Sequence, residues 1–355
     1  MKIGFYSPYI DTLSGGEKYI LTAASVASAE HDVTIFWDDT EVIKKAGNRF
    51  DIDLSKVTVA PNIFLPTASF VKRLSQTRDL DFLFFLSDGS IPLSLSKKLI
   101  IHLQFPVVWI PSLSWKEKLK VRRVSTFVCN SKFTKGFIDK KYKVNSKVIY
   151  PPVDIEMPVM KKENIILTIG RYSKFHNGDD FKKISVMIDQ FKKMYDTQKT
   201  NWKFVIVTSF LPEQQEALEQ LQSSIAHYPI EILRDVTFEQ LNQLYATSKI
   251  YWHAAGFGED LTAHPELAEH FGISTAEAMA AGAVPIVYNA GGLKEIVEND
   301  KTGYLWTTLD ELIGKTLKIM GDDKKREQIE KAATSSVSYF GKKRFSAEIL
   351  KLFHE

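Results

Sequence analysis

The 355-residue chain has almost no cysteine, no long apolar run and little net charge. Its single cysteine, Cys129, excludes an intrachain disulfide and any metal site built on several cysteines. With 46 basic and 43 acidic residues the formal charge is +3, which gives no argument for nucleic acid as a partner. No apolar run approaches the roughly 18 residues of a membrane-spanning helix. The first residues predict a β-strand and not a signal peptide, so we expect a cytoplasmic protein.

The chain does contain short apolar runs that alternate with helical stretches, in two successive series. The first series of predicted strands is 2–6, 31–37, 57–60, 82–86, 98–102 and 126–129, and the second is 164–169, 202–208, 230–233, 250–253 and 285–288. Such alternation is typical of parallel sheets covered by helices on both faces. Pro151-Pro152 predicts a linker between the series. We therefore expect an α/β protein of two doubly wound, Rossmann-like domains, 1–153 and 154–339, that face each other across a cleft, with helix 340–355 packed back on the first domain.

The stretch 263–292 carries the clearest pattern for chemistry. Glu269 and Glu277 lie on either side of a Phe-Gly-Ile-Ser turn that leads into a helix. The first amides of a helix have no intrahelical acceptor and favour an anion such as phosphate, and a carboxylate nearby can bind ribose hydroxyls. A second interpretation is a capping box, in which Ser274 and Glu277 satisfy each other's backbone donors and Glu269 is a solvated loop residue. The spacing alone leaves both interpretations open.

Six motifs occur in a fixed order along nearly the whole chain. They are Ser14-Gly15-Gly16-Glu17, Asn130-Ser131-Lys132-Phe133, Tyr150-Pro151-Pro152-Val153-Asp154, Gly170-Arg171, the E-x7-E pair from Glu269 to Glu277 with its Phe271-Gly272 interior, and Gly291-Gly292. Together they resemble family 4 of the GT-B glycosyltransferases, which are retaining enzymes that use a nucleotide-sugar donor, and in particular its mannosyltransferase-like members.

The resemblance implies transfer of a sugar from GDP-mannose or a UDP-sugar to a hydroxyl of a glycan or lipid-linked acceptor. The first domain would bind the acceptor and the second the donor, and no metal or other cofactor is expected. Charge that grows on the leaving diphosphate would then be stabilised by fixed cations. Arg171 matches the family's clamp arginine, whose guanidinium can hold two phosphate oxygens. The clamp lysine is displaced by an insertion, and Lys182 or Lys183 is favoured over Lys174.

The resemblance also assigns the remaining candidate residues. Glu277 would bind the ribose and Glu269 the transferred sugar, while Gly15 and Gly16 would let the backbone approach the diphosphate. The turn Phe271-Gly272-Ile273-Ser274 and the pair Gly291-Gly292 would donate backbone amides, and the backbone around Val236 would hold the nucleobase. His102 would face the sugar from the first domain. His253 would lie on the lip of the donor site or serve the structure alone.

Several alternatives stay open at this point. Asp51-Ile52-Asp53 and Asp79-Leu80-Asp81 resemble a metal-binding D-x-D pattern but lack a second carboxylate cluster, so no metal is assigned. The tryptophans and basic residues of 107–123 predict either contact with the inner, anionic face of a membrane or an ordinary solvated helix. A sugar-nucleotide epimerase or hydrolase would turn over the donor without an acceptor. A catalytically silent nucleotide-sugar binding protein is disfavoured because Arg171, Glu269 and Glu277 are all present.

Overall fold

A computed structural model describes residues 1–110, 112–172, 180–210 and 214–355. The chain forms two compact units, Met1–Pro152 with Lys342–Glu355, and Val153–Gly341. Val153 and Phe340 both lie in the second unit, where the Val153 N–H donates to the Phe340 carbonyl over 3.0 Å. Among the described residues no helix combines the length and apolar character needed to cross a membrane.

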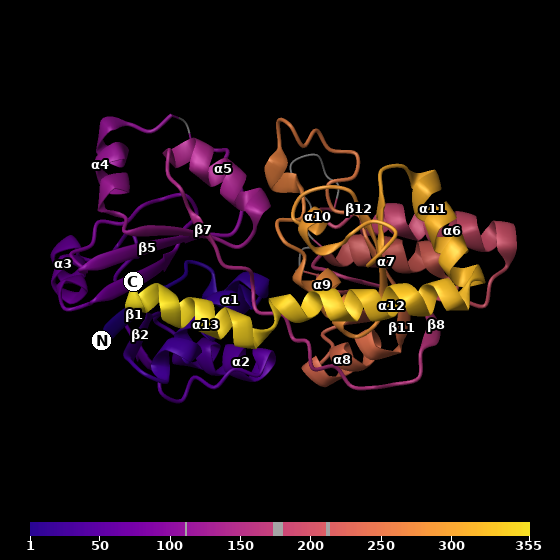
Figure 1. Ribbon diagram of the computed structural model, residues 1–355, viewed down its shortest axis with the longest axis horizontal. Helices are drawn as coiled ribbons and strands as arrows, with labels where there is room; N and C mark the ends of the chain where they lie inside the picture. Colours follow the sequence, from indigo (N-terminus) through magenta and orange to yellow (C-terminus); the bar gives the residue numbers. More distant parts are fainter. Residues whose placement is uncertain (111, 173–179, 211–213) are drawn as a thin grey trace. The chain divides into compact units, whose positions relative to one another are not determined.

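The first unit is built on a seven-stranded parallel sheet in the order β3-β2-β1-β4-β5-β6-β7. Its strands are β1 (Lys2–Tyr6), β2 (Asp32–Phe36), β3 (Thr58–Ala60), β4 (Phe82–Leu86), β5 (Lys98–Leu103), β6 (Thr126–Cys129) and β7 (Lys147–Val148), and its helices are α1 (Gly15–Ser28), α2 (Thr40–Phe50), α3 (Phe70–Arg78), α4 (Trp115–Arg123), α5 (Lys132–Tyr142) and α13 (Lys342–His354). In register, Ile3 lies opposite Val33 and Phe82. Side chains of α1, α2 and α13 form the core on one face and those of α5 on the other, so a central strand such as β4 is buried at every position. Figure 1 shows α13 running beside α1.

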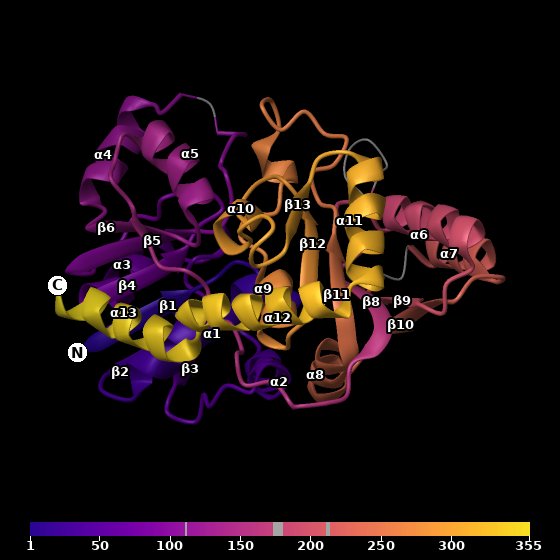
Figure 2. The same cartoon turned by 45° about the vertical axis from the view of Figure 1, so that its right-hand side comes forward.

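The second unit repeats this design with a six-stranded parallel sheet in the order β10-β9-β8-β11-β12-β13 (Figure 2). Its strands are β8 (Glu163–Ile169), β9 (Lys203–Thr208), β10 (Ile230–Arg234), β11 (Ser248–His253), β12 (Val284–Tyr288) and β13 (Tyr304–Trp306), and its helices are α6 (Ile184–Gln198), α7 (Gln215–Ile225), α8 (Phe238–Thr247), α9 (Ile273–Ala280), α10 (Leu293–Ile296), α11 (Leu309–Gly321) and α12 (Asp323–Val337). Ile250 of β11 lies opposite Ile166 and Val284. Residues of α6 and α11 belong to one core, and those of α8 and α9 to another.

The strand order determines where each sheet offers a binding site. The order reverses between β1 and β4 in the first sheet and between β8 and β11 in the second. In open parallel sheets, ligands bind beyond the carboxyl ends of the strands at this reversal. In the second unit these ends lead into Gly170-Arg171 and into the segment that follows His253. Many of the predicted donor residues therefore lie at or beyond this edge of the sheet.

A buried carboxylate holds the start of α6, with a consequence for the site. Helix α6 begins at Ile184, where the buried Asp180 carboxylate accepts the Ile184 and Ser185 N–H groups over 2.8 and 3.3 Å. Lys183 precedes this helix in the left-handed region, at φ 56°. Lys182 and Lys183 therefore lie in a turn held by Asp180 rather than on a helix.

Candidate functional site

Glu269 is the centre of a hydrogen-bonded group of side chains in the second unit. Its Oε2 accepts from Lys182 Nζ over 2.6 Å and from His253 Nε2 over 2.8 Å. The side chain of Glu269 is 15% exposed, that of Lys182 is 18% exposed and that of His253 is 1% exposed. The alternative that Glu269 is a solvated loop residue is wrong, because His253 at the end of β11 and Lys182 in the turn before α6 both bind its carboxylate.

Electrostatics fix the protonation of this group. Burial acts to raise the pKa of Glu269, but Lys182 and His253 together outweigh it and hold that pKa well below its ordinary value. Burial and the Lys182 charge together lower the pKa of His253 more than Glu269 raises it, so this imidazole is neutral at neutral pH. The neutral ring donates from Nε2 to Glu269 and accepts the Ala255 N–H at Nδ1 over 3.4 Å. At neutral pH the site therefore contains an ionised carboxylate, a neutral imidazole and an ammonium group.

The two adjacent lysines have different partners. Lys183 Nζ forms an ion pair with Glu259 at 2.5 Å, with side chains that are 6% and 14% exposed. The structure thus brings Lys182 to Glu269 and directs Lys183 to another carboxylate. Lys174, the third lysine considered, lies outside the described residues. Arg171 follows β8 at the carboxyl edge of the sheet and is exposed there.

Glu277 is buried within α9 and bound by a tyrosine. Its Oε2 accepts from the Tyr245 hydroxyl over 3.0 Å, and burial together with the Glu277 charge raises the pKa of Tyr245 well above its usual value. The phenol is therefore protonated at neutral pH and acts as the donor. The capping box is not formed, since α9 has Gly272 as its N-cap residue. Ser274, in the first turn, instead accepts from the Tyr251 hydroxyl over 2.8 Å.

The Gly291-Gly292 turn supports the Glu269 loop from behind. Gly291 has φ 59°, and a Cβ there would overlap the carbonyl oxygen of Glu269. The Gly292 N–H donates to that same carbonyl over 2.8 Å. This amide is therefore engaged within the chain, and the turn fixes the backbone of Glu269 rather than offering that N–H to a ligand.

Val236, whose backbone is expected to hold the nucleobase, lies in the second unit near Glu277. Val236 follows β10 and precedes the N-cap residue of α8, Thr237. Its half-buried side chain packs in the same cluster as Tyr245 and Tyr251. Because that cluster also contains Ala278 of α9, Val236 lies near the helix that carries Glu277.

In the first unit, His102 is wholly buried at the end of β5. Its Nδ1 donates to the Val128 carbonyl over 3.2 Å, its Nε2 accepts from Gln104 over 3.0 Å, and its ring stacks on Tyr19 with 4.1 Å between centroids. Burial lowers the pKa of His102 to about 3. In this structure the His102 side chain is thus enclosed and neutral.

Gln104 connects this histidine to the glycine loop. Its Nε2 also donates to the Gly16 carbonyl over 3.2 Å, and a Cβ at Gly16 would overlap its Oε1. Gly15 and Gly16 open α1 after Ser14, whose N–H donates to the buried Glu17 carboxylate over 2.8 Å. The backbone at Gly16 thus approaches the Gln104 side chain closely.

Sequence reasoning missed Gln104 and Tyr245. Gln104 stands two residues after His102 at the end of the same strand, a spacing that places both side chains on one side, and this could have been noticed. Tyr245 lies 32 residues before its partner Glu277, and no local pattern indicates the pairing.

The sequence matches a known family. A profile of the family described as "Glycosyl transferases group 1" matches residues 156–336, just over half of the chain and nearly all of the second unit.

Similar proteins of known activity are mannosyltransferases. The chain is 26% identical to a GDP-Man:Man(3)GlcNAc(2)-PP-Dol alpha-1,2-mannosyltransferase of Dictyostelium discoideum, over 60% of this chain and 43% of that protein, and 27% identical to the Homo sapiens protein of the same name, over 62% and 46%. It is 24% identical to the alpha-1,3/1,6-mannosyltransferase ALG2 of Candida glabrata, over 86% and 81%. The chain thus spans about half the length of the alpha-1,2-mannosyltransferases it matches.

Solved structures with the same fold match both units. Anabaena Alr3699/HepE, solved in complex with UDP and glucose, gives a TM-score of 0.73 at 18% identity over 100% of both chains. The sucrose-phosphate synthase of Thermosynechococcus elongatus gives 0.71 at 14% identity, over 100% of this chain and 98% of that one. At these identities the likeness establishes the GT-B fold.

Proposed function

The chain belongs to the group 1 glycosyl transferases, a GT-B family, and from that premise we propose that it transfers a sugar from a nucleoside diphosphate sugar to an acceptor hydroxyl. The observation that supports this most is the group of Glu269, Lys182 and His253 at the carboxyl edge of the second sheet. We further propose that the anomeric configuration is retained and that no metal takes part.

Glu269 binds the transferred sugar in this proposal. A carboxylate whose pKa is held low accepts hydrogen bonds from sugar hydroxyls and does not serve as a proton donor at neutral pH. His253 keeps this carboxylate oriented, and the Gly292 N–H holds the backbone carbonyl of the same residue. The position of the carboxylate is therefore fixed before the donor binds, so little ordering is left to the reaction.

Lys182 and Arg171 supply positive charge to the leaving diphosphate. When the sugar–phosphate bond breaks, negative charge grows on the phosphate oxygens, and fixed cations in a partly dehydrated site stabilise it. The Lys182 ammonium is 2.6 Å from Glu269, so it lies next to the sugar position, where the scissile bond would be. Arg171, exposed after β8, is the second cation at this edge. Two cations at this edge can stabilise the charge that a metal stabilises in other transferases.

Glu277 binds the ribose. Tyr245 occupies one oxygen of its carboxylate, which orients the group within a buried site. The carboxylate accepts hydrogen bonds from the two ribose hydroxyls. The phosphates bind near the start of α9, where backbone amides lack intrahelical acceptors. The nucleobase then extends toward Val236, which lies in the same cluster of side chains as Tyr245.

We propose GDP-mannose as the donor and a glycan or lipid-linked hydroxyl as the acceptor, on the strength of the names of the mannosyltransferase relatives. The test is to titrate GDP, UDP and ADP and follow the melting temperature, which rises with the affinity of a bound ligand. The donor that corresponds to the best nucleotide is then incubated with and without acceptor glycans. GDP is expected to give the largest shift, and transfer is expected only with acceptor. Donor turnover at the same rate without acceptor would instead indicate a hydrolase or epimerase.

We also propose that α4 and the segment before it contact an anionic membrane. No side chain of α4 is buried, and Trp109, Trp115 and Leu119 are 54%, 68% and 50% exposed. These apolar groups stand beside the basic residues of α4, a combination that binds anionic lipid surfaces. Pro111 within this region lies outside the described residues.

Cosedimentation with vesicles tests the membrane contact. The protein is expected to sediment with phosphatidylglycerol vesicles at low salt, and less so at high salt. Trp115→Ser should weaken the binding, while Tyr339→Ser, a change at an aromatic residue of the second unit that is 56% exposed, should not. Equal binding of both variants, or none by the wild type, would refute the assignment.

A further inference from the structure

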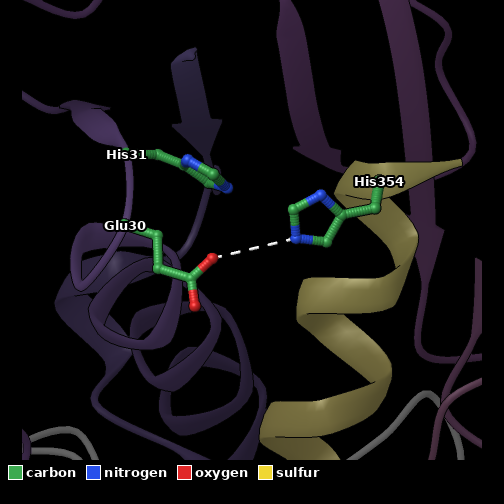
Figure 3. A group of neighbouring side chains, drawn as sticks. All are labelled: Glu30, His31 and His354. Carbon is green, nitrogen blue, oxygen red and sulfur yellow. Dashed lines mark ion pairs between the residues drawn. The ribbon is translucent and has the colours of Figure 1, made fainter.

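Two histidines and a glutamate from opposite ends of the chain meet in the first unit. Glu30 and His31 lie just beyond α1 and before β2, and His354 is the last residue of α13. One ligand atom from each of the three side chains lies within 4.8 Å of the other two, and in the described part of the chain no other group of three or more such residues meets this condition. Figure 3 shows the Glu30 carboxylate and the His31 ring turned toward the His354 ring.

Packing of the core holds these side chains together. Phe345, Ile349, Leu352 and Phe353 of α13 are buried in one cluster with the apolar side chains of α1. The His31 ring lies edge-on to Phe353 at 6.4 Å and to His354 at 6.0 Å between centroids. The position of His354 over the end of α1 thus follows from the docking of the whole helix.

The chemistry of the group suits a zinc ion. Imidazole nitrogen and carboxylate oxygen are ordinary zinc ligands, with bonds of about 2.0–2.2 Å, which puts two ligands of a tetrahedral ion roughly 3.4 Å apart. Glu30 Oε2 and His354 Nε2 are 3.8 Å apart, too far for a hydrogen bond and close to that spacing. His31 Nε2 is a buried ring nitrogen that, among the described residues, has no hydrogen-bond partner. Such an atom is expected to have a partner, and a metal would provide one.

We propose that Glu30, His31 and His354 bind one zinc ion, with water in the fourth position. The side chains of Glu30 and His354 are 51% and 60% exposed, so they have room for the adjustment of roughly 1 Å that a common ion requires. The ion would join the end of α1 to the end of α13 and so fasten the returning helix to the first unit. The site takes no part in sugar transfer, and the proposal does not depend on the proposed function.

Zinc binding to the untagged full-length chain tests the proposal, by competition with a chromogenic chelator. The wild type is expected to bind one zinc per chain, and cobalt is expected to give the visible absorption bands of a tetrahedral ion. Because zinc binds the folded state, a hundredfold excess over its dissociation constant should raise the melting temperature by roughly 5 °C, reversibly on addition of EDTA.

Matched variants separate this site from ordinary surface histidines. His354→Gln and His31→Gln are expected to lose the zinc and the thermal shift, and His354→Gln, at an exposed position, should melt like the wild type in EDTA. His264→Gln serves as the control, because His264 is 61% exposed and pairs with one carboxylate, Glu266, at 3.1 Å. Zinc binding that survives in His354→Gln, absence of zinc binding by the wild type, or a doubled mass in sedimentation with zinc would each overturn the proposal.

Discussion

Replacement of Lys182 by methionine tests the assignment of the clamp. The substitution removes an ammonium 2.6 Å from a carboxylate, with both side chains less than a fifth exposed. Because the carboxylate keeps its His253 hydrogen bond and some solvent, we expect a loss of about 2–3 kcal/mol of stability, below the range for a fully buried pair. Loss of one charge-stabilising donor should lower kcat by about 100-fold or more. The pKa of Glu269 should rise, because its largest stabilising charge is gone.

Chemical denaturation and steady-state kinetics separate the two effects. In the double variant Lys182→Met/Glu269→Gln no unpaired charge remains, so stability should recover while transfer does not. Lys183→Met is the matched control, since it breaks the neighbouring ion pair to Glu259 and should lower stability without a comparable loss of kcat. A Lys182→Met enzyme within threefold of the wild-type kcat would refute the clamp assignment.

Three further predictions follow from other parts of the structure. Tyr245→Phe should weaken nucleotide binding at least tenfold, since a hydrogen bond to a charged group is worth about 1.5–3 kcal/mol. Tyr304→Phe is the control and should bind normally, because the Tyr304 hydroxyl has no hydrogen-bond partner among the described residues. Equal affinities of the two variants by calorimetry would contradict this. His102 has a pKa of about 3 in the folded state and about 6.5 in the unfolded state, so the unfolded state binds the proton and the free energy of unfolding falls as the pH drops below 6.5. In urea titrations the wild type should lose about 2 kcal/mol more of this free energy than His102→Gln between pH 7 and pH 5. Equal losses in the two proteins would refute the enclosed neutral histidine. Dialysis against EDTA should leave the transfer rate unchanged well below the melting temperature, and a loss restored by Mg²⁺ or Mn²⁺ would contradict charge stabilisation by Lys182 and Arg171 alone.

Local patterns in the sequence predicted most of the sheet and part of the site. The strands at 2–6, 82–86 and 126–129 coincide with β1, β4 and β6, because strands buried on both faces leave uninterrupted apolar runs. The strand β7 was missed because two residues carry no period, and the three-residue strand β13 was missed as well.

The sequence did not indicate which side chains form hydrogen bonds with one another in the site. Whether Lys182 or Lys183 reaches Glu269 depends on the turn that Asp180 caps, and no periodicity encodes that turn. The capping-box interpretation of Ser274 and Glu277 failed because Tyr245 and Tyr251, distant in sequence, bind those side chains instead. Long-range pairing decided each of these roles.

Calorimetric titration of GDP into the wild type and Glu277→Gln asks whether the carboxyl edge of the second sheet binds the nucleotide. One GDP is expected per wild-type chain, with binding at least tenfold weaker in the variant, because Glu277 is proposed to accept the ribose hydroxyls. Equal affinity in the two proteins would contradict the placement of the donor at Glu277, and no binding of GDP or UDP by the wild type would contradict the donor site as a whole.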